Sequence, residues 1–412
     1  MIRILPELSQ KEIKKTMASI GVDPRGIKIM LPKALTRLIR IDSISNIAAN
    51  ILKQEMLSLG GDAAIARDVL TCKTKKTDCL LIGNLSQFNR LSQKLYKQPF
   101  NLNIVADDIC RALKNHQKEK FTINLGPYKL NLDTRPKIMG IVNLTPDSFS
   151  GDGLYSSCVV RRASCVDKAI DFAEKMVKDG ADIIDIGGES SRPGAKPVSV
   201  KEELDRTIPV IKLLAKKINL PISIDTRRQE VAQAALDNGA VIVNDITGLK
   251  NPKMAKIIAH YKAGIIIMHM KGSPATMQVK TLYNSLITDI LEYLRDAISR
   301  AEDAGIDREK IIVDPGIGFG KTFEHNLEIL KNLSDFKVLG RPILAGTSRK
   351  SFIGKILNTL PRERVSGTIA SCILAAKSGA RILRVHDVKE TKQAFEVMNA
   401  INEERKTSLS KI

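Results

Sequence analysis

Short apolar runs alternate with longer amphipathic stretches along the chain after residue 136. The runs are rich in isoleucine and valine, and most of them end in a polar residue or in glycine. Such runs are typical of buried strands, and the stretches between them, for example 166–181 and 286–305, have the spacing of helices. We expect eight strands, at residues 137–143, 182–188, 221–226, 240–245, 264–269, 311–316, 342–347 and 381–387.

The expected strands are too apolar to face water on either side. Eight strand–helix units of this kind favour an α/β fold, a (β/α)8 TIM barrel, over the alternative of a doubly wound open sheet. Residues 121–136 form two alternating stretches around Gly126 and Pro127, which predicts a β-hairpin. Because the hairpin precedes the first strand, we expect it to cap the N-terminal end of the barrel.

The first 117 residues follow a different pattern. Residues 26–31 and 78–83 are typical of strands, and residues 44–61 and 85–96 are typical of helices. We interpret residues 1–117 as a small α/β module and residues 118–412 as the barrel domain. The module offers no set of ligand-binding residues, so we expect it to contact another subunit or partner and to be dispensable for chemistry.

The composition is that of a globular protein, with 43% hydrophobic and 27% charged residues. No apolar run approaches the ~20 residues that span a bilayer, and the first residues lack the apolar core of a secretory signal. We therefore expect a cytoplasmic protein without membrane contact. The six cysteines include no CxxC pair, so free thiols are expected in that reducing compartment.

The formal charge of +20 indicates an affinity for anions, either nucleic acids or small phosphorylated substrates. A basic face that binds RNA usually adds aromatic side chains on which bases stack. Aromatic residues make up only 4% of this chain, and tryptophan is absent from it. Small phosphorylated molecules are therefore the favoured partners, and nucleic acid is disfavoured.

The ends of the expected strands carry the candidate chemistry, because barrel enzymes place their sites at the C-terminal ends of the strands. A single polar residue there is often only the cap of the next helix. Six or more on one rim are hard to explain as caps. The rim residues are Asn143, Asp147, Glu189–Arg192, Asp225, Asn244, Asp245, Asp314, Ser348–Lys350, Arg384 and His386.

These residues fall into two chemical groups. Asp225, Asn244 and Asp314 offer carboxylates and an amide, which suit the adjacent donors and acceptors of an amino-pyrimidinone ring. The second group offers cationic donors, which suit a diphosphate. It consists of Arg192, Arg349, Lys350, Arg384 and His386. The implied ligand has a planar heterocycle at one end and an anion at the other.

Eight sequence blocks between about residue 120 and residue 400 resemble, in order, those of the dihydropteroate synthase family. The blocks are IMGIVNLTPDSFSGDG, IDIGGESSRPGA, ISIDTRR, VIVNDITG, IMHMKGSPATMQ, IIVDPGIGFGKT, AGTSRKSFIG and RVHDV. The resemblance implies an enzyme that joins 6-hydroxymethyl-7,8-dihydropterin diphosphate to p-aminobenzoate and releases pyrophosphate, assisted by Mg²⁺. It also implies a homodimer.

The resemblance assigns roles to matching residues. It implies that the pterin ring is held by Asp225, Asn244, Asp314 and Lys350, with Arg384 stacked on one face and Met268 or Met270 on the other. The diphosphate would be held by Asn143, Arg192, Arg384 and His386, with Asn143 also near the metal. The arylamine site would be lined by Phe149, Ser191, Pro193, Phe319 and Ser351.

Three alternatives share parts of this pattern. Pterin-dependent methyltransferases have the barrel and the pterin carboxylates but bind no diphosphate, so the cationic blocks favour the synthase. A synthase that uses a larger phosphorylated arylamine, as in methanopterin synthesis, fits the basic charge as well as p-aminobenzoate does. A non-catalytic binding protein should have lost part of the anion site, and the sequence shows no such loss.

Overall fold

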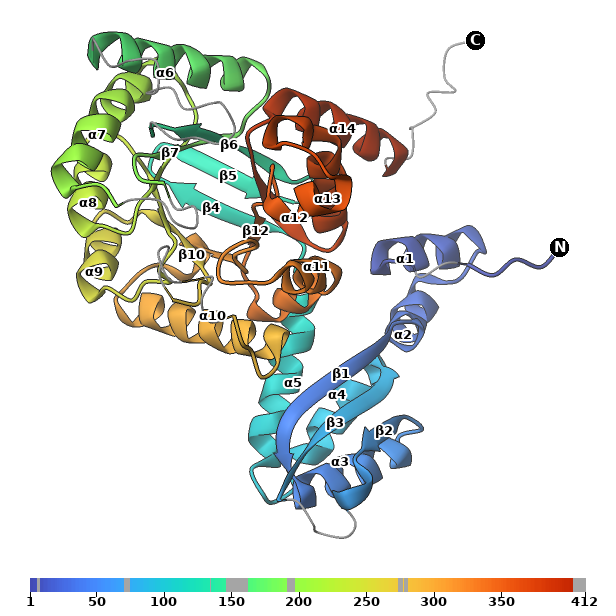
Figure 1. Ribbon diagram of the computed structural model, residues 1–412. Helices are drawn as coiled ribbons and strands as arrows, with labels where there is room; N and C mark the ends of the chain where they lie inside the picture. Colours follow the sequence, from blue (N-terminus) through green and yellow to red (C-terminus); the bar gives the residue numbers. More distant parts are fainter. Residues whose placement is uncertain are drawn as a thin grey trace, which may run out of the picture. The chain divides into compact units, whose positions relative to one another are not determined.

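The computed structural model describes residues 1–5, 8–69, 75–133, 135–145, 162–190, 197–272, 277 and 281–402. The chain divides into two compact units, Met1–Lys114 and Asn115–Ile412. Both units appear in Figure 1.

The first unit packs helices against an antiparallel sheet of order β1-β3-β2. Large side chains such as Leu52, Leu81 and Phe88 are fully buried between them. The small α/β module expected here is confirmed. Its elements are α1 (Gln10–Ser19), α2 (Pro24–Ala34), β1 (Thr36–Ser45), α3 (Asn46–Ser58), β2 (Asp62–Ile65), η1 (Arg67–Val69), β3 (Lys76–Asn84), α4 (Leu85–Leu95) and α5 (Leu102–His116).

One expected strand of this unit, residues 26–31, is wrong, because the segment belongs to α2. Asp23 caps that helix by accepting a hydrogen bond from the N–H of Arg25, and Pro24 occupies its first turn. The cap and the proline start a helix whose apolar positions happen to alternate like those of a strand. Of these positions, Ile27 is buried, whereas Ile29 is exposed.

The second unit is a closed barrel of eight parallel strands in the order β10-β11-β12-β13-β6-β7-β8-β9. Pairing of β13 with β6 closes the barrel. The TIM-barrel prediction is confirmed. The strands are β6 (Lys137–Asn143), β7 (Ile183–Gly187), β8 (Ile222–Asp225), β9 (Ile242–Asp245), β10 (Gly264–Met268), β11 (Ile311–Asp314), β12 (Ile343–Ala345) and β13 (Ala380–Val385).

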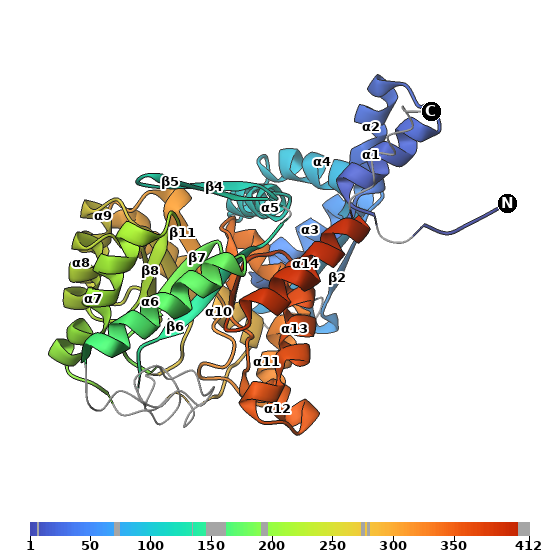
Figure 2. The same cartoon turned by 90° about the horizontal axis from the view of Figure 1, so that it is seen from above.

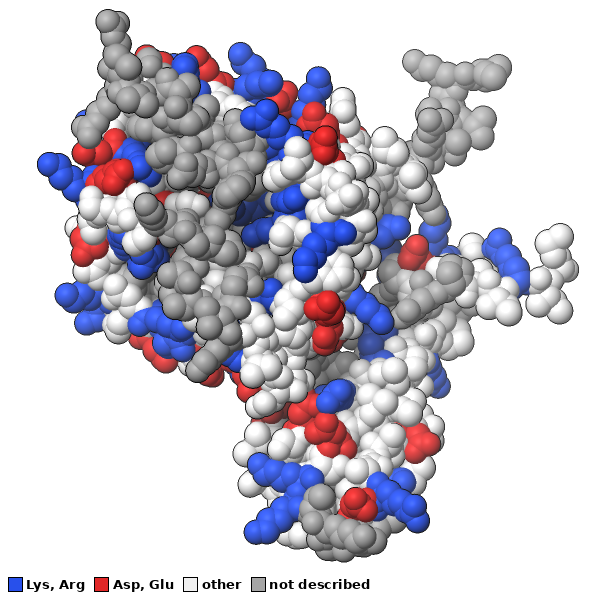
Figure 3. All heavy atoms as spheres, viewed as in Figure 1, with Lys and Arg blue, Asp and Glu red and all other residues white. Residues whose placement is uncertain are grey.

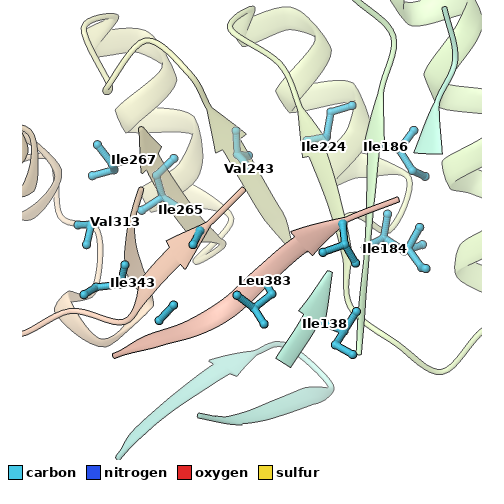
Figure 4. Packing of buried hydrophobic residues seen from close by; sticks show 14 of the residues in the cluster. Ile138, Ile184, Ile186, Ile224, Val243, Ile265, Ile267, Val313, Ile343 and Leu383 are labelled. Atoms are coloured by element: carbon cyan, nitrogen blue, oxygen red, sulfur yellow. The ribbon is translucent and has the colours of Figure 1, made fainter. Parts of the chain in front are cut away.

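Helices surround the strands (Figure 1) and pack on their outward side chains. Figure 4 shows part of this layer, where isoleucine, valine and leucine side chains project from successive strands. The helices are α6 (Arg162–Lys178), α7 (Val200–Lys217), α8 (Gln229–Asp237), α9 (Pro252–His260), α10 (Leu286–Asp303), α11 (Phe323–Lys331), α12 (Ser351–Leu357), α13 (Val365–Lys377) and α14 (Val388–Asn402). Short 3-10 segments are η2 (Arg308–Lys310), η3 (Leu333–Leu339) and η4 (Pro361–Glu363).

A hairpin of β4 (Phe121–Leu125) and β5 (Tyr128–Leu132) lies at one end of the barrel (Figure 2). Its buried leucines and isoleucine form one cluster with the lowest interior layer of the strands. That cluster consists of Ile123, Leu125, Leu130, Leu132, Met139, Ile183, Ile242, Ile266, Ile312, Leu344 and Ile382. The hairpin seals the N-terminal end, as expected, which leaves the opposite end for chemistry.

Two further expectations concern membranes and thiols. Among the described helices, none has the length and apolarity needed to span a membrane. Cys79, Cys110 and Cys372 are free thiols, as expected. Cys165 is disulfide-bonded, so the expectation of free thiols is wrong for that residue.

Candidate active site

The C-terminal ends of the strands surround a cavity of about 450 Å³. Nearly every strand contributes a polar side chain to it, because each strand ends at the same rim. The cavity wall includes most of the residues expected from the sequence: Asn143, Asp225, Asn244, Met268, Asp314, Phe319, Lys350, Ser351, Arg384 and His386.

Five other expected residues are placed differently. Met270 is buried in an apolar cluster with Ile246, Met268 and Met277, and this cluster packs against Phe319. Of the two methionines expected to line the ring, Met268 lies on the cavity wall and Met270 does not. Phe149, Ser191, Arg192 and Pro193 lie outside the described residues, so their expected roles stay predictions.

Arg384 connects two carboxylates at the rim, those of fully buried Asp185 and largely buried Asp225. Its Nε lies 2.6 Å from Oδ2 of Asp185, and its Nη2 lies 2.7 Å from Oδ2 of Asp225. The amide of Asn244 donates to the same Asp185 oxygen at 3.2 Å. These contacts hold the guanidinium, the two carboxylates and the Asn244 amide in one fixed arrangement.

Asp185 was missed in the sequence because it stands between isoleucines inside a strand rather than at a strand end. Side chains alternate along a strand, so Asp185 points into the barrel while Ile184 and Ile186 point outward to the helices. The signal available in the sequence was a charged residue in an apolar strand, which requires a partner of opposite charge. Arg384 is that partner.

Burial shifts the pKa values of two carboxylates on the cavity wall. It raises the pKa of Asp225 to about 7, against the opposing effect of Arg384, and nearby Asp185 adds to the rise. Burial also raises the pKa of Asp314, whereas the Gly316 N–H, which donates to its Oδ1 at 2.7 Å, opposes that shift. Both carboxylates are therefore set to gain from a ligand that donates hydrogen bonds.

An apolar and cationic wall lies beside these carboxylates. The ammonium of Lys350 lies 4.1 Å from the centroid of the Phe319 ring, a cation–π contact. Met268 is nearly fully buried and lines the cavity between these groups and the end of β10. A flat heterocycle could thus meet hydrogen-bonding groups at its edge and apolar groups on its face.

A turn after β12 carries the serine and the cationic residues of another part of the cavity wall. Ser348 Oγ lies 3.0 Å from Nδ1 of His386 and accepts from the His386 N–H at 3.1 Å. Arg349 has a positive φ of 56° and pairs with Asp387, with Nε 3.0 Å from Oδ2. Arg349, grouped above with the diphosphate-binding cations, therefore holds the turn that presents Ser348 and Lys350.

A second ion network supports the loops after β7 and β8. Glu189 binds Arg227 at 2.9 Å and Arg228 at 3.0 Å. Arg228 also pairs with Glu203 at 3.0 Å, and Thr226 donates to Glu203 at 2.6 Å. Because Glu189 lines the cavity, this network fixes one of its walls.

The residues present fit a magnesium ion held mainly by substrate. Within the described parts of the chain, His, Cys, Asp and Glu form no cluster that could hold a metal by themselves. Mg²⁺ commonly binds through one or two protein oxygens together with substrate phosphates and water. Asn143 places an amide on the cavity wall, which suits that pattern.

Figure 3 shows Lys and Arg side chains scattered among acidic and neutral ones on the face it displays. On this face they do not gather into one continuous basic patch.

Residues 139–386 match the family model described as pterin binding enzyme. The dihydropteroate synthase of Synechocystis is 49% identical over 269 residues, which are 65% of this chain and 90% of that protein. A solved structure of the Xanthomonas albilineans enzyme with 4-aminobenzoic acid has a TM-score of 0.63 and 40% identity, covering 69% of this chain and 99% of that one.

A third relative extends over more of the chain. It is a probable bifunctional folylpolyglutamate synthase/dihydropteroate synthase of Halobacterium salinarum, 38% identical over 395 residues. The match covers 95% of this chain and 46% of the relative.

The chain therefore belongs to the family of pterin-binding enzymes. Its likeness to the dihydropteroate synthases in sequence and fold makes it a transferase of that kind, as the sequence blocks indicated.

Proposed function

We propose that the protein condenses 6-hydroxymethyl-7,8-dihydropterin diphosphate with p-aminobenzoate to give 7,8-dihydropteroate and pyrophosphate. The observation that carries this proposal is the pair of carboxylates, buried Asp314 and largely buried Asp225, beside Asn244 and Lys350 on the cavity wall. This donor and acceptor set matches the edge of an amino-pyrimidinone ring. The cationic groups at the opposite end match a diphosphate.

At the ring end, Asp225 and Asp314 accept hydrogen bonds from ring N–H groups, while Asn244 and Lys350 complete the edge. Arg384 lies flat against the ring because Asp185 and Asp225 fix its guanidinium. Its positive charge is balanced by these carboxylates before substrate arrives. The site is therefore prepared for the ring without rearrangement, which favours binding.

At the anion end, Asn143, Arg192, Arg384 and His386 hold the diphosphate. Mg²⁺, when bound near Asn143, would supply positive charge that stabilises the departing pyrophosphate. His386 is oriented by Ser348, so its ring has one fixed direction toward the cavity. These groups stabilise charge that develops as the leaving group departs.

In the chemical step, the amine nitrogen of p-aminobenzoate forms a bond to the pterin methylene carbon. The bond from that carbon to the diphosphate oxygen breaks, its electron pair leaves with pyrophosphate, and the amine loses one proton. A neutral arylamine needs positioning more than deprotonation. Phe319 and Ser351 line the arylamine end, together with Phe149, Ser191 and Pro193 of the family pattern.

A pyrophosphate-release assay tests the proposal. Purified protein is given the pterin diphosphate with either p-aminobenzoate or a phosphorylated ribosyl-aniline. Faster release with p-aminobenzoate is expected, together with formation of 7,8-dihydropteroate. Release only with the phosphorylated amine would assign the chain to the methanopterin-type reaction instead.

We further propose a homodimer and a cytoplasmic location. Large apolar side chains are exposed on the last helices of the barrel, including Leu374 on α13 and Val397 and Ile401 on α14. Covering them in a second copy removes apolar surface from water. Light scattering of the purified protein tests the dimer, and cell fractionation tests the location.

The first unit has a separate proposed role as a contact surface. The Synechocystis synthase matches 65% of this chain, whereas the Halobacterium protein matches 95% of it. The match to the Halobacterium protein, whose name includes a second enzyme, therefore includes the first unit. The family model matches residues 139–386, outside the first unit, which supports a role for that unit apart from the chemical step.

A further inference from the structure

Lys321 is a buried lysine whose ammonium contacts only uncharged acceptors among its hydrogen-bond partners. Its side chain follows the loop after β11, and the residue is 3% exposed. The Nζ donates to the carbonyls of Gly316 at 2.8 Å and Phe319 at 3.0 Å. It also lies 3.0 Å from Nδ1 of His269 and 3.4 Å from the His269 carbonyl.

This arrangement suits a protonated lysine and a neutral histidine. Burial and the neighbouring Lys321 lower the pKa of His269 to about 2, so its Nδ1 is free to accept from the ammonium. An ammonium removed from water is unfavourable unless its hydrogen bonds are satisfied. A methionine would fill a similar volume without the unfavourable free energy of removing a charge from water. Packing alone therefore does not explain a lysine here.

Lys321 fastens the loop 315–320 to the end of β10. Gly316 passes so close to that strand that an added Cβ would lie 1.9 Å from the His269 carbonyl oxygen. Lys321 bonds the carbonyls of both Gly316 and His269. The ammonium therefore joins two backbone segments at the point where they touch.

Two cavity groups depend on this loop. The N–H of Gly316 donates to Oδ1 of Asp314, which directs that carboxylate. The carbonyl of Phe319 accepts from Lys321, and the Phe319 ring meets Lys350. Lys321 is not one of the residues that line the cavity, so it reaches the substrate through Asp314, Phe319 and Lys350.

We propose that Lys321 is a positioning residue for the pterin end of the site, where its ammonium holds the loop 315–320 in the geometry that lets Asp314 bind the ring and lets Phe319 hold Lys350 in place for it. This inference rests on the proposed function for the identity of the ring. In this inference, Lys321 affects pterin binding without touching the substrate.

The charged state of Lys321 responds to groups on three elements. Burial lowers the pKa of Lys321 to about 7, Asp314 on β11 opposes this shift, and Lys350 at the start of α12 adds to it. His269, after β10, is the remaining titratable group that faces the ammonium. The ammonium is lost as pH rises through about 7, so pterin affinity should decline on the alkaline side.

The test compares Lys321→Met with the wild-type protein by calorimetry, using the pterin alcohol, which lacks the diphosphate. We expect affinity to fall about tenfold or more, since charge-assisted hydrogen bonds that set the site are removed. The KM for the pterin diphosphate should rise by a similar factor, with a smaller change in kcat. A purely structural role would reduce the active fraction, and thus kcat, at unchanged KM and affinity.

Lys310→Met is the matched control, because Lys310 also donates to a backbone carbonyl, that of Lys262 at 2.6 Å, but next to the opposite end of β11. It should bind the pterin alcohol like the wild type. Lys321→Arg keeps the charge and should recover part of the lost affinity. Because Asp225 titrates in both proteins over the same range, the pH effect of Lys321 is read from the ratio of wild-type to Lys321→Met affinity, which should decline above about pH 7.

Two results would overturn the inference. One is a folded Lys321→Met protein with wild-type pterin affinity, and the other is a ratio of wild-type to Lys321→Met affinity that does not decline as pH rises above about 7, a ratio in which the titration of Asp225 cancels. The proposed function fails separately, if the wild type binds the pterin alcohol but releases no pyrophosphate with p-aminobenzoate.

Discussion

The two ends of the barrel are made by the same eight strands but have opposite chemistry. At the hairpin end, the interior layer is entirely apolar and almost completely buried. At the cavity end, the interior positions hold buried carboxylates, an amide and an arginine. Strand β13 shows the change over two residues, from Ile382 in the apolar layer to Arg384 in the site.

This difference separates stability from binding along each strand. Apolar side chains at the hairpin end leave water on folding and stabilise the closed barrel. Carboxylates at the cavity end are unfavourable when buried, as the raised pKa values of Asp225 and Asp314 indicate. We therefore expect substitutions at the two ends to affect different measurements.

Ile382→Ala should have the largest effect, and it should act on stability. Removing a fully buried side chain from the apolar layer is expected to lower the free energy of unfolding by about 2–5 kcal/mol. Urea unfolding measures this loss, with Ile382→Val as a control at about 0.5–1.5 kcal/mol. Pterin affinity of the folded protein should be unchanged. A large loss of affinity would show that the hairpin end of the barrel also affects binding.

Asp225→Asn should act on binding instead. Loss of one charged acceptor is expected to weaken the pterin alcohol complex by about 1.5–3 kcal/mol, or about 10- to 150-fold. Calorimetry measures the affinity, and urea unfolding measures a stability change that should be smaller than that of Ile382→Ala. Unchanged affinity would remove Asp225 from the ring site.

The same residue should give the protein a characteristic pH dependence. The pKa of Asp225 is raised from 3.8 to about 7, so the folded state holds a proton that the unfolded state releases between these values. The contribution of Asp225 to stability is therefore fully present below about pH 4 and is lost as pH rises through about 7. Unfolding of the wild type and Asp225→Asn across this range should show the difference; parallel curves would contradict it.

Removal of the first unit should have the smallest effect on the site. A chain that begins at Glu119 keeps the hairpin and the whole barrel, and the Synechocystis relative matches 90% of its own length within 65% of this chain. Pyrophosphate release should stay within about threefold of the full chain, with any loss in oligomeric state or stability. A folded, monodisperse but inactive product would show that the first unit reaches the active site.

Most of the barrel could be predicted from sequence because strand runs and cavity residues are local signals. Expected strand 137–143 is β6, and expected strand 264–269 differs from β10 by one residue. Residues such as Asp225 and Asp314 were visible because a polar residue ends an apolar run.

The parts that were missed depend on contacts between distant segments. Asp185 is explained by Arg384, which lies on another strand, and Lys321 is explained by His269 after β10. The pairing of Arg349 with Asp387 cannot be read from spacing either, although Arg349 also lines the cavity, so its grouping with the anion ligands stays a prediction. Local pattern locates the site, whereas three-dimensional pairing decides which charged groups remain for a substrate.

The pairing of β6 with β13 also bears on how this enzyme unit can evolve. These strands are the first and last of the barrel, and α14, which follows β13, packs on β6. In Figure 2 the hairpin before β6 lies at one end of the barrel, and α14 runs toward that end. The hairpin that precedes the barrel and the last described helix therefore both lie toward the end away from the cavity. The barrel can therefore be joined to different domains in different proteins without a change in its active site.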